Sequence, residues 1–157
     1  MHHAGLHLDL PLEFSADQTM VSFRAPPPVK PDARVIQRQT AIRTSFIVHR
    51  RDVGSDAGLG ILAGEVTAEL VSSVAGLSAM TTESIAFRDG APGIVIGFDF
   101  GAPEVGTARQ FHALRKDGAV LTTLTLTVDK MTLNNDKKAH WFTLLQSAVP
   151  HGNGALL

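Results

Sequence analysis

The stretch GIVIGFDFGAPEVGTARQFHALRKDGAVLTTLTLTVDK, residues 93–130, decides the fold of this chain. Residues 94–100 and residues 120–128 each alternate between two sets of side chains, and this period of two is typical of strands. Residues 107–115 lie between these runs and predict a third strand, bounded by turn-forming residues at 102–106 and 116–118. The three segments together predict an antiparallel meander.

The two faces of this meander differ in chemistry. In the last strand, Thr123 and Thr125 alternate with Leu124, so one face carries hydroxyl and methyl groups and the other is apolar. In the middle strand, alternation places Gln110 and His112 opposite Phe111. If Phe111 joins the core, Gln110 and His112 share the mixed face with the threonines. A binding surface and a merely solvated sheet face are both consistent with this pattern.

Composition limits the class of protein. The 157 residues suffice for one core, and we expect a single domain over residues 1–157. A formal net charge of -1 gives no general electrostatic reason to bind nucleic acid or anionic lipid. The absence of cysteine excludes disulfides and thiolate metal sites. With neither a signal-peptide pattern nor a membrane-spanning apolar run, we expect a cytoplasmic protein without stable membrane association or nucleic-acid binding.

The rest of the chain predicts an α+β fold, with an antiparallel β-sheet and helices packed on one face. Further strands are expected at residues 6–10, 19–24, 40–50 and 81–88. Helices are expected from Ser55 or Asp56 to Val74 and over residues 136–149, and the glycines at 58, 60 and 64 favour close packing of the first helix. We expect the proline-rich loop 26–39 and the tail 151–157 to be mobile.

No group of residues predicts catalysis or metal binding. The seven histidines show no pair spaced within one helical turn beside a carboxylate, and no G-x-S-x-G elbow is present. Asp99 lies within an apolar strand, where a general base is conceivable, but a position facing solvent or a dimer partner on the open face is favoured. We therefore expect no enzymatic activity, no cofactor and no metal.

Several segments resemble the DcrB-related family, whose fold is PsbP/Mog1-like. They are DQTM at 17–20, SFIV at 45–48 with HRRD at 49–52, the helix that follows, ARQF at 108–111 and DGAVLTTL at 117–124. The resemblance rests on the order of these segments and covers residues from about 6 to 150. The loop at 26–39 departs from the family, in which this connection is shorter.

The resemblance implies a function as well as a fold. One branch of the family consists of envelope lipoproteins, which need a lipobox cysteine that this chain lacks. The other consists of Eag-type chaperones of type VI secretion, which are cytoplasmic homodimers. They hold the N-terminal transmembrane segments of effectors, often Rhs proteins, until these load on the secretion spike. The implied partners are a secreted effector with apolar N-terminal helices, a second copy of the chain and, through the effector, the spike protein.

Alternation and resemblance together predict the partner-binding surface. We expect a homodimer, because a half-covered sheet would leave Ile47 and Leu121 exposed in a monomer. The alternatives are a scaffold or small-molecule-binding protein of the same fold without a helix client, and an enzyme with a small pocket. The residues expected to bind the partner lie opposite the core residues of their strands: Met20, Ser22, Ser45, Ile47, Gln110, His112, Thr123 and Thr125.

Overall fold

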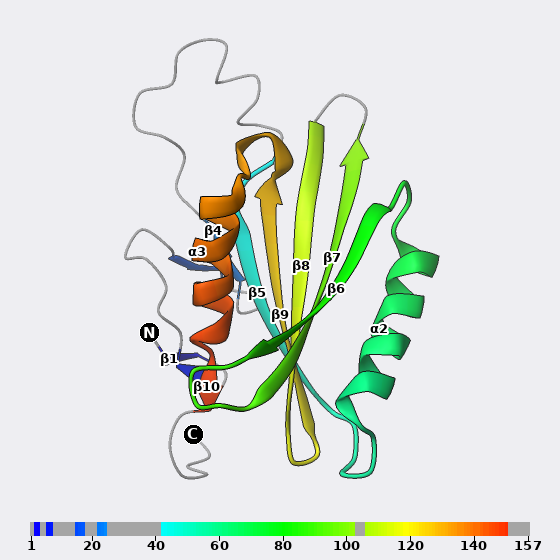
Figure 1. The fold of residues 1–157 in the computed structure, drawn as a ribbon, viewed down its shortest axis with the longest axis vertical. Coiled ribbons are helices and arrows are strands. Elements are labelled where there is room, and N and C mark those ends of the chain that lie inside the picture. The colour runs from blue at the N-terminus through cyan, green and yellow to red at the C-terminus, as the bar shows by residue number, and fades with distance from the viewer. Residues whose placement is uncertain are drawn as a thin grey trace.

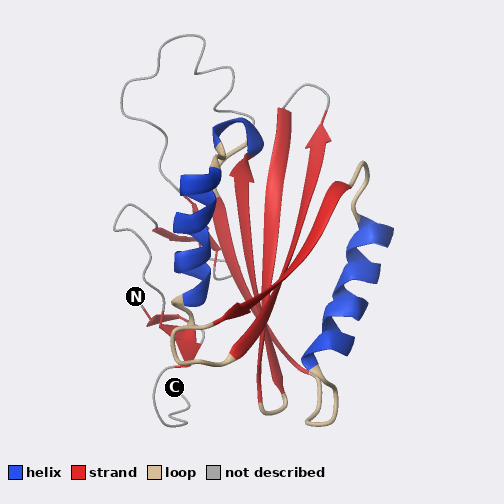
Figure 2. Ribbon diagram, viewed as in Figure 1, coloured by secondary structure: helices blue, strands red, loops and turns tan. Residues whose placement is uncertain are grey.

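A computed structural model describes residues 2–3, 6–7, 15–17, 22–24, 42–102 and 106–150. These residues form two antiparallel sheets and two α-helices (Figure 1, Figure 2). The seven-stranded sheet has the order β3-β4-β5-β9-β8-β7-β6, and a three-stranded sheet has the order β1-β2-β10. The elements are β1 (His2–His3), β2 (Leu6–His7), β3 (Ser15–Asp17), β4 (Ser22–Arg24), β5 (Ser45–Asp52), α2 (Leu59–Ser73), β6 (Ser78–Ala86), β7 (Pro92–Ala102), β8 (Gly106–Asp117), β9 (Val120–Asp129), the 3₁₀ turn η1 (Lys130–Thr132), α3 (Asn135–Gln146) and β10 (Val149–Pro150).

The predicted meander is confirmed. Strands β7, β8 and β9 are neighbours, and their register runs without a shift from Ala108 opposite Asp129 to Asp117 opposite Val120. The tight turn after β8 uses Gly118, whose φ of 60° is one that glycine adopts at low cost. The α+β class with an antiparallel sheet is also as predicted.

The two helices pack on opposite faces of the sheet, which corrects the prediction that both cover one face (Figure 1). Helix α3 shares a buried cluster with Val95, Phe111 and Ala113. Helix α2 shares a separate cluster with Ile96 and Leu114. These two residues directly follow Val95 and Ala113 in the same strands, so their side chains point to the opposite face of the sheet. The alternating pattern therefore has apolar residues on both faces at one end of the sheet, and each face receives a helix.

The start of α2 also differs from the prediction. Its N-cap is Gly58, without a side-chain capping bond, so neither Ser55 nor Asp56 begins the helix. The expected close packing through glycine is wrong for Gly60 and Gly64, because both are exposed and a Cβ on either would meet nothing within 4 Å. The helix instead packs on the sheet through larger residues, namely Leu62, Ala63 and Val66.

At the N-terminus, the predicted strand at 6–10 is described only as Leu6–His7. This segment pairs with β10 in the small sheet rather than with the large sheet. The predicted mobile segments, 26–39 and 151–157, lie outside the described residues.

Candidate functional site

The sheet face that carries α2 is only partly covered by that helix. Ile96, Leu114 and Leu121 on this face are all 0% exposed and join α2 in one buried cluster. Seven further side chains on β5, β8 and β9 point to this same face of the sheet. All seven are half-buried, so they keep access to solvent. We call this region the ladder face. It consists of Ser45, Ile47, Gln110, His112, Thr123, Thr125 and Thr127.

The strand register brings most of these residues into two rows. Ile47 lies opposite Thr125, which lies opposite His112. Two residues further along β9, Thr127 lies opposite Ser45 on one side and opposite Gln110 on the other. Residues directly opposite in an antiparallel pair share a face and lie close together. The period of two in the sequence therefore predicted the grouping correctly.

A chain of hydrogen bonds joins the polar members of the ladder face. The amide nitrogen of Gln110 donates to the Thr127 hydroxyl at 2.8 Å. The Oε1 atom of Gln110 lies 2.8 Å from Nε2 of His112, and the Thr125 hydroxyl lies 3.3 Å from Nδ1 of the same ring. Because Oε1 only accepts, Nε2 carries the proton, and Nδ1 accepts from the Thr125 hydroxyl. The chain is therefore built from neutral groups.

The His112 ring is held in a setting that disfavours its charged form. It stacks on Phe98 with a centroid distance of 5.6 Å and an interplanar angle of 22°. Burial lowers the pKa of His112 from 6.5 to about 4, because a charged imidazolium would lose hydration in this position. At neutral pH the ladder face therefore carries no charge, since its other six side chains are Ser, Thr, Ile and Gln.

Most, but not all, of the residues predicted to bind a partner lie on the ladder face. Ser45, Ile47, Gln110, His112, Thr123 and Thr125 are all on the ladder face. Ser22 lies opposite Ile47 in the backbone register, and Met20 lies outside the described residues. The expectation that Leu121 would be exposed is wrong, because α2 buries it. Thr127 was missed, although it has the same parity as Thr123 and Thr125.

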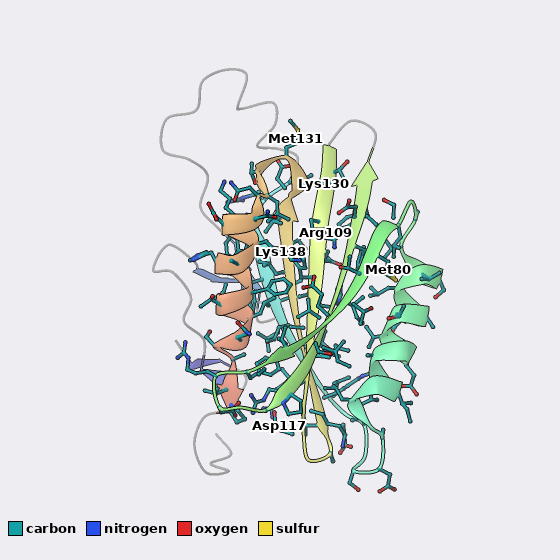
Figure 3. The ribbon with its side chains drawn as sticks, in the orientation of Figure 1. Met80, Arg109, Asp117, Lys130, Met131 and Lys138 are labelled. Atoms are coloured by element: carbon teal, nitrogen blue, oxygen red, sulfur yellow. The ribbon has the colours of Figure 1, made fainter. Side chains whose placement is uncertain are left out.

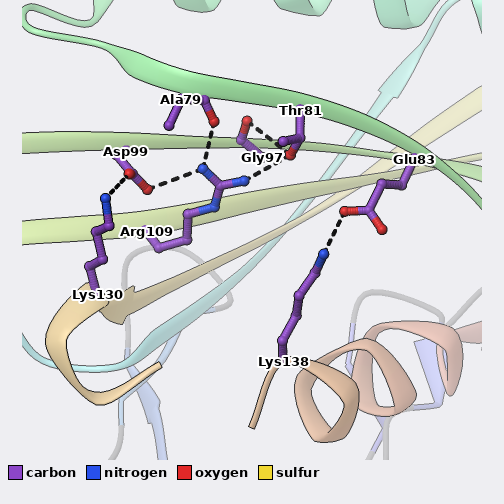
Figure 4. A network of polar contacts seen from close by, with 8 residues as sticks. All are labelled: Ala79, Thr81, Glu83, Gly97, Asp99, Arg109, Lys130 and Lys138. Carbon is purple, nitrogen blue, oxygen red and sulfur yellow. Dashed lines mark hydrogen bonds and ion pairs between the residues drawn. The ribbon is translucent and has the colours of Figure 1, made fainter. Parts of the chain in front are cut away.

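A second polar network lies on the opposite face, where Asp99 is 2% exposed (Figure 4). Its carboxylate accepts from Nη1 of Arg109 at 3.1 Å and from Nζ of Lys130 at 2.5 Å. The position on an open face expected for Asp99 is therefore wrong. Both carboxylate oxygens are engaged by cations, which gives Asp99 a structural role in this network.

Glycine at position 97 makes room for this network. A Cβ there would lie 2.7 Å from Nη2 of Arg109 and 2.7 Å from the Thr81 hydroxyl oxygen. Arg109 also donates to the carbonyl oxygen of Ala79 at 2.7 Å, where the chain has a positive φ of 49° inside a β-bulge. Such a backbone conformation is costly for a residue other than glycine, and the arginine helps to hold it.

A third network lies at the far end of the sheet, around Asp117 (Figure 3). Arg115 is 2% exposed and binds two carboxylates, Asp89 at 2.5 Å and Asp117 at 2.7 Å. It also donates to the carbonyl oxygen of Ala148 at 3.2 Å and lies 4.9 Å from the Phe87 ring centroid. The hydrogen bond from Arg115 holds the pKa of Asp89 below its usual value of 3.8. Alternation places Arg115 and Asp117 on the same face of β8, but it gave no sign of Asp89 or Ala148, which lie 26 and 33 residues from Arg115.

Among the described residues, no group of three His, Asp or Glu side chains is placed to hold a metal ion. None of their helices combines the length and apolar character needed to cross a bilayer.

Comparison with known proteins shows likeness in structure but not in sequence. No protein-family model matches the chain, and no curated protein matches it. Among solved structures, it is similar to PA94 of Pseudomonas aeruginosa, a protein of unknown function described as a candidate regulator. The TM-score is 0.63 at 16% identity, over 96% of this chain and 100% of that one.

Two further solved structures are similar over most of the chain. The cyanobacterial PsbP (CyanoP) of Synechocystis sp. PCC 6803 gives a TM-score of 0.60 at 16% identity, over 93% of this chain and 86% of that one. LpqN of Mycobacterium tuberculosis, involved in cell envelope biogenesis, gives 0.53 at 12% identity, over 89% and 75%. At these identities the likeness concerns the fold alone, and the chain has a PsbP-like α+β fold.

Proposed function

We propose that this chain is a cytoplasmic chaperone or adaptor that binds the apolar N-terminal helices of a type VI secretion effector, such as an Rhs protein, before the effector loads on the spike. It acts as a binding protein and not as an enzyme. The observation that carries this proposal is the ladder face, an uncharged and half-buried sheet surface that lies beside α2.

The chemistry of the ladder face suits an apolar helix. Ile47 and the methyl groups of Thr123 and Thr125 offer apolar contacts of moderate size. One hydrogen bond joins Gln110 to His112, and their other polar atoms are bonded to Thr127 and Thr125. A helix can therefore cover these uncharged side chains without leaving an unpaired charge. Burial of such a surface is favourable in proportion to the apolar area that leaves water.

Polar groups on the same face can serve as neighbours for the helix. A transmembrane helix normally packs against others through small residues and through hydrogen bonds from Ser, Thr, Asn and Gln side chains. Within the described part of the chain, the hydroxyl of Thr123 has no hydrogen-bond partner, and its side chain is half-buried. It can therefore bond to a polar atom of the client, as the side chain of a neighbouring membrane helix would.

The test is co-expression with the apolar N-terminal segment of an effector encoded beside this chain, followed by pull-down. Ile47→Arg places a charge where the helix must pack, at a cost of about 2–3 kcal/mol if the charge can still reach water at its tip. We therefore expect recovery of the segment to fall by at least about tenfold. Ile61→Arg is the matched control, because Ile61 lies on α2, is 66% exposed and is not part of the ladder face.

Both variants must give the wild-type circular dichroism spectrum for the comparison to count. Equal recovery by wild type and folded Ile47→Arg would exclude the ladder face as the binding surface. Failure of the wild type to retain any effector segment would argue against a helix client and favour the scaffold interpretation.

A further inference from the structure

The ladder face ends at a pair of cations. Two residues before Thr123 in β9, Leu121 lies opposite Arg51 of β5 and opposite Lys116 of β8. Residues directly opposite in an antiparallel pair share a face, so both cations stand on the side of the sheet that carries the ladder face. Arg51 is exposed, and Lys116 donates to a neutral acceptor, the carbonyl oxygen of Ser55, at 3.0 Å. Neither cation is neutralised by a carboxylate in the described part of the chain.

The start of α2 adds positive potential at the same end of the sheet. The helix is capped by Gly58 without a side-chain hydrogen bond, and its first turn contains no acidic residue. Unpaired amides and the peptide dipoles give such a helix N-terminus a partial positive charge. The contact of Lys116 with Ser55, three residues before Gly58, places this helix start near the two cations.

Few carboxylates offset these charges on this face. Asp52 and Asp117 directly follow Arg51 and Lys116 in their strands, so alternation directs them to the opposite face. Asp56, in the connection to α2, is exposed and offsets part of the charge. The sum remains positive, and we call Arg51 and Lys116 the basic end of the ladder face.

The opposite end of the ladder face is close to neutral. Asp129 lies two residues beyond Thr127 in β9, and its carboxylate accepts from the amide of Met131 at 2.9 Å. Arg43, just before β5, brings one positive charge and already takes part in an interaction within the chain. One carboxylate and one cation roughly cancel, so the positive excess lies at the basic end.

The open part of this face has the length of a membrane-spanning helix. Helix α2 lies mainly over β7 and β8, at the side of the sheet away from β5 (Figure 1). Along β9, the distance from Leu121 to Asp129 is about 27 Å, at about 3.4 Å per residue. A helix that rises about 1.5 Å per residue covers this distance with about 18 residues, and about 20 cross a bilayer. An apolar helix laid along β9 and β5 therefore reaches the basic end with one of its ends.

We propose, on the basis of the helix binding proposed above, that the client helix lies antiparallel to α2 with its C-terminal end at the basic end, and that clients carry Asp or Glu directly after the apolar segment. Because α2 begins near the basic end, a helix that ends there runs in the opposite direction. The C-terminus of a helix is the negative end of its dipole, and an acidic flank adds full negative charge. Arg51 and Lys116 therefore favour this polarity over the reverse.

Binding of synthetic helices tests the polarity. Two probes share a segment of about 18 Leu and Ala residues between neutral Ser–Gly extensions, with a polyethylene glycol chain on the N-terminal extension for solubility. The first probe carries two Glu residues directly after the segment, and the second carries them directly before it. At low ionic strength we expect the wild type to bind the first probe at least about fivefold more tightly, because an exposed ion pair and the helix dipole each contribute a factor of a few.

Charge reversal at the basic end supplies the matched comparison. Arg51→Glu should abolish the preference for the first probe. Arg50→Glu changes the net charge equally, but Arg50 is the neighbouring residue in β5 and is directed to the opposite face, so this control should keep the wild-type preference. Replacing the two Glu residues of the first probe by Lys should weaken its binding to wild type and strengthen its binding to Arg51→Glu.

The possible failures are distinguishable. Equal affinity of the wild type for both probes, or tighter binding of the second, would overturn the polarity while helix binding itself still stands. Loss of the preference in Arg50→Glu would also overturn it, because the effect would then follow net charge and not the basic end. If the wild type binds neither probe, the proposed function fails together with the polarity. Ile47→Arg should weaken the binding of both probes, and undiminished binding by this variant would overturn the placement of the helix on the ladder face.

Discussion

Protonation of His112 should destabilise the fold over a defined pH range. The pKa of His112 is about 4 in the folded chain, against an ordinary value of 6.5. Because the folded-state pKa is depressed, the unfolded chain binds the proton more readily, and stability falls as the pH drops from 6.5 toward 4. With these two values, the loss between about pH 7 and about pH 5 is roughly 2 kcal/mol.

The measurement is urea unfolding followed by circular dichroism at several pH values. His112→Gln removes the titrating ring, so this variant should lose far less stability than wild type over the same interval. At neutral pH it should be less stable by about 1 kcal/mol, because a hydrogen bond and a ring contact are lost. His49→Gln is the control, since His49 is exposed on β5 and its removal should leave the wild-type response. An equal loss of stability in His112→Gln and wild type would refute the reasoning.

The two other networks give further predictions. Arg115→Met should lower the free energy of unfolding in urea by about 2–3 kcal/mol. This loss is smaller than that expected on breaking a fully buried ion pair, because the Asp89 side chain is 37% exposed and can be hydrated. The lowered pKa of Asp89 contributes stability that is lost as the pH falls below about 4, so this acid-induced loss should be smaller in Arg115→Met than in wild type. Gly97→Ala should cost about 2–3 kcal/mol by displacing Arg109 from Asp99, and a melting temperature within error of wild type would contradict this.

Alternation along the strands predicted the strands of the meander and the grouping of the ladder face. The period of two settles which residues share a face, and the placement of Gln110 and His112 opposite Phe111 follows from it. The sequence did not reveal that α2 and α3 take opposite faces. Both faces carry apolar residues near the hairpin of β8 and β9, and alternation does not say which helix covers which face.

The charged networks could not be predicted from alternation alone, because the strand register must also be known. Asp99 lies directly opposite Arg109 between β7 and β8, and this pairing depends on how the hairpin aligns the two strands. The contact from Arg115 to Asp89 joins segments 26 residues apart, and the contact to Ala148 spans 33. Such contacts come from the tertiary arrangement, which local patterns in the sequence do not encode.

The position of Arg115 has a consequence for local opening of the structure. The Arg115 guanidinium binds the β6–β7 turn at Asp89, the β8–β9 hairpin at Asp117 and the segment just after α3 at Ala148. If any one of these three segments moves away, it leaves a buried cation with fewer partners, which is costly in a low-dielectric interior. We therefore expect the turn, the hairpin and the segment after α3 to open together as one cooperative unit and not one segment at a time.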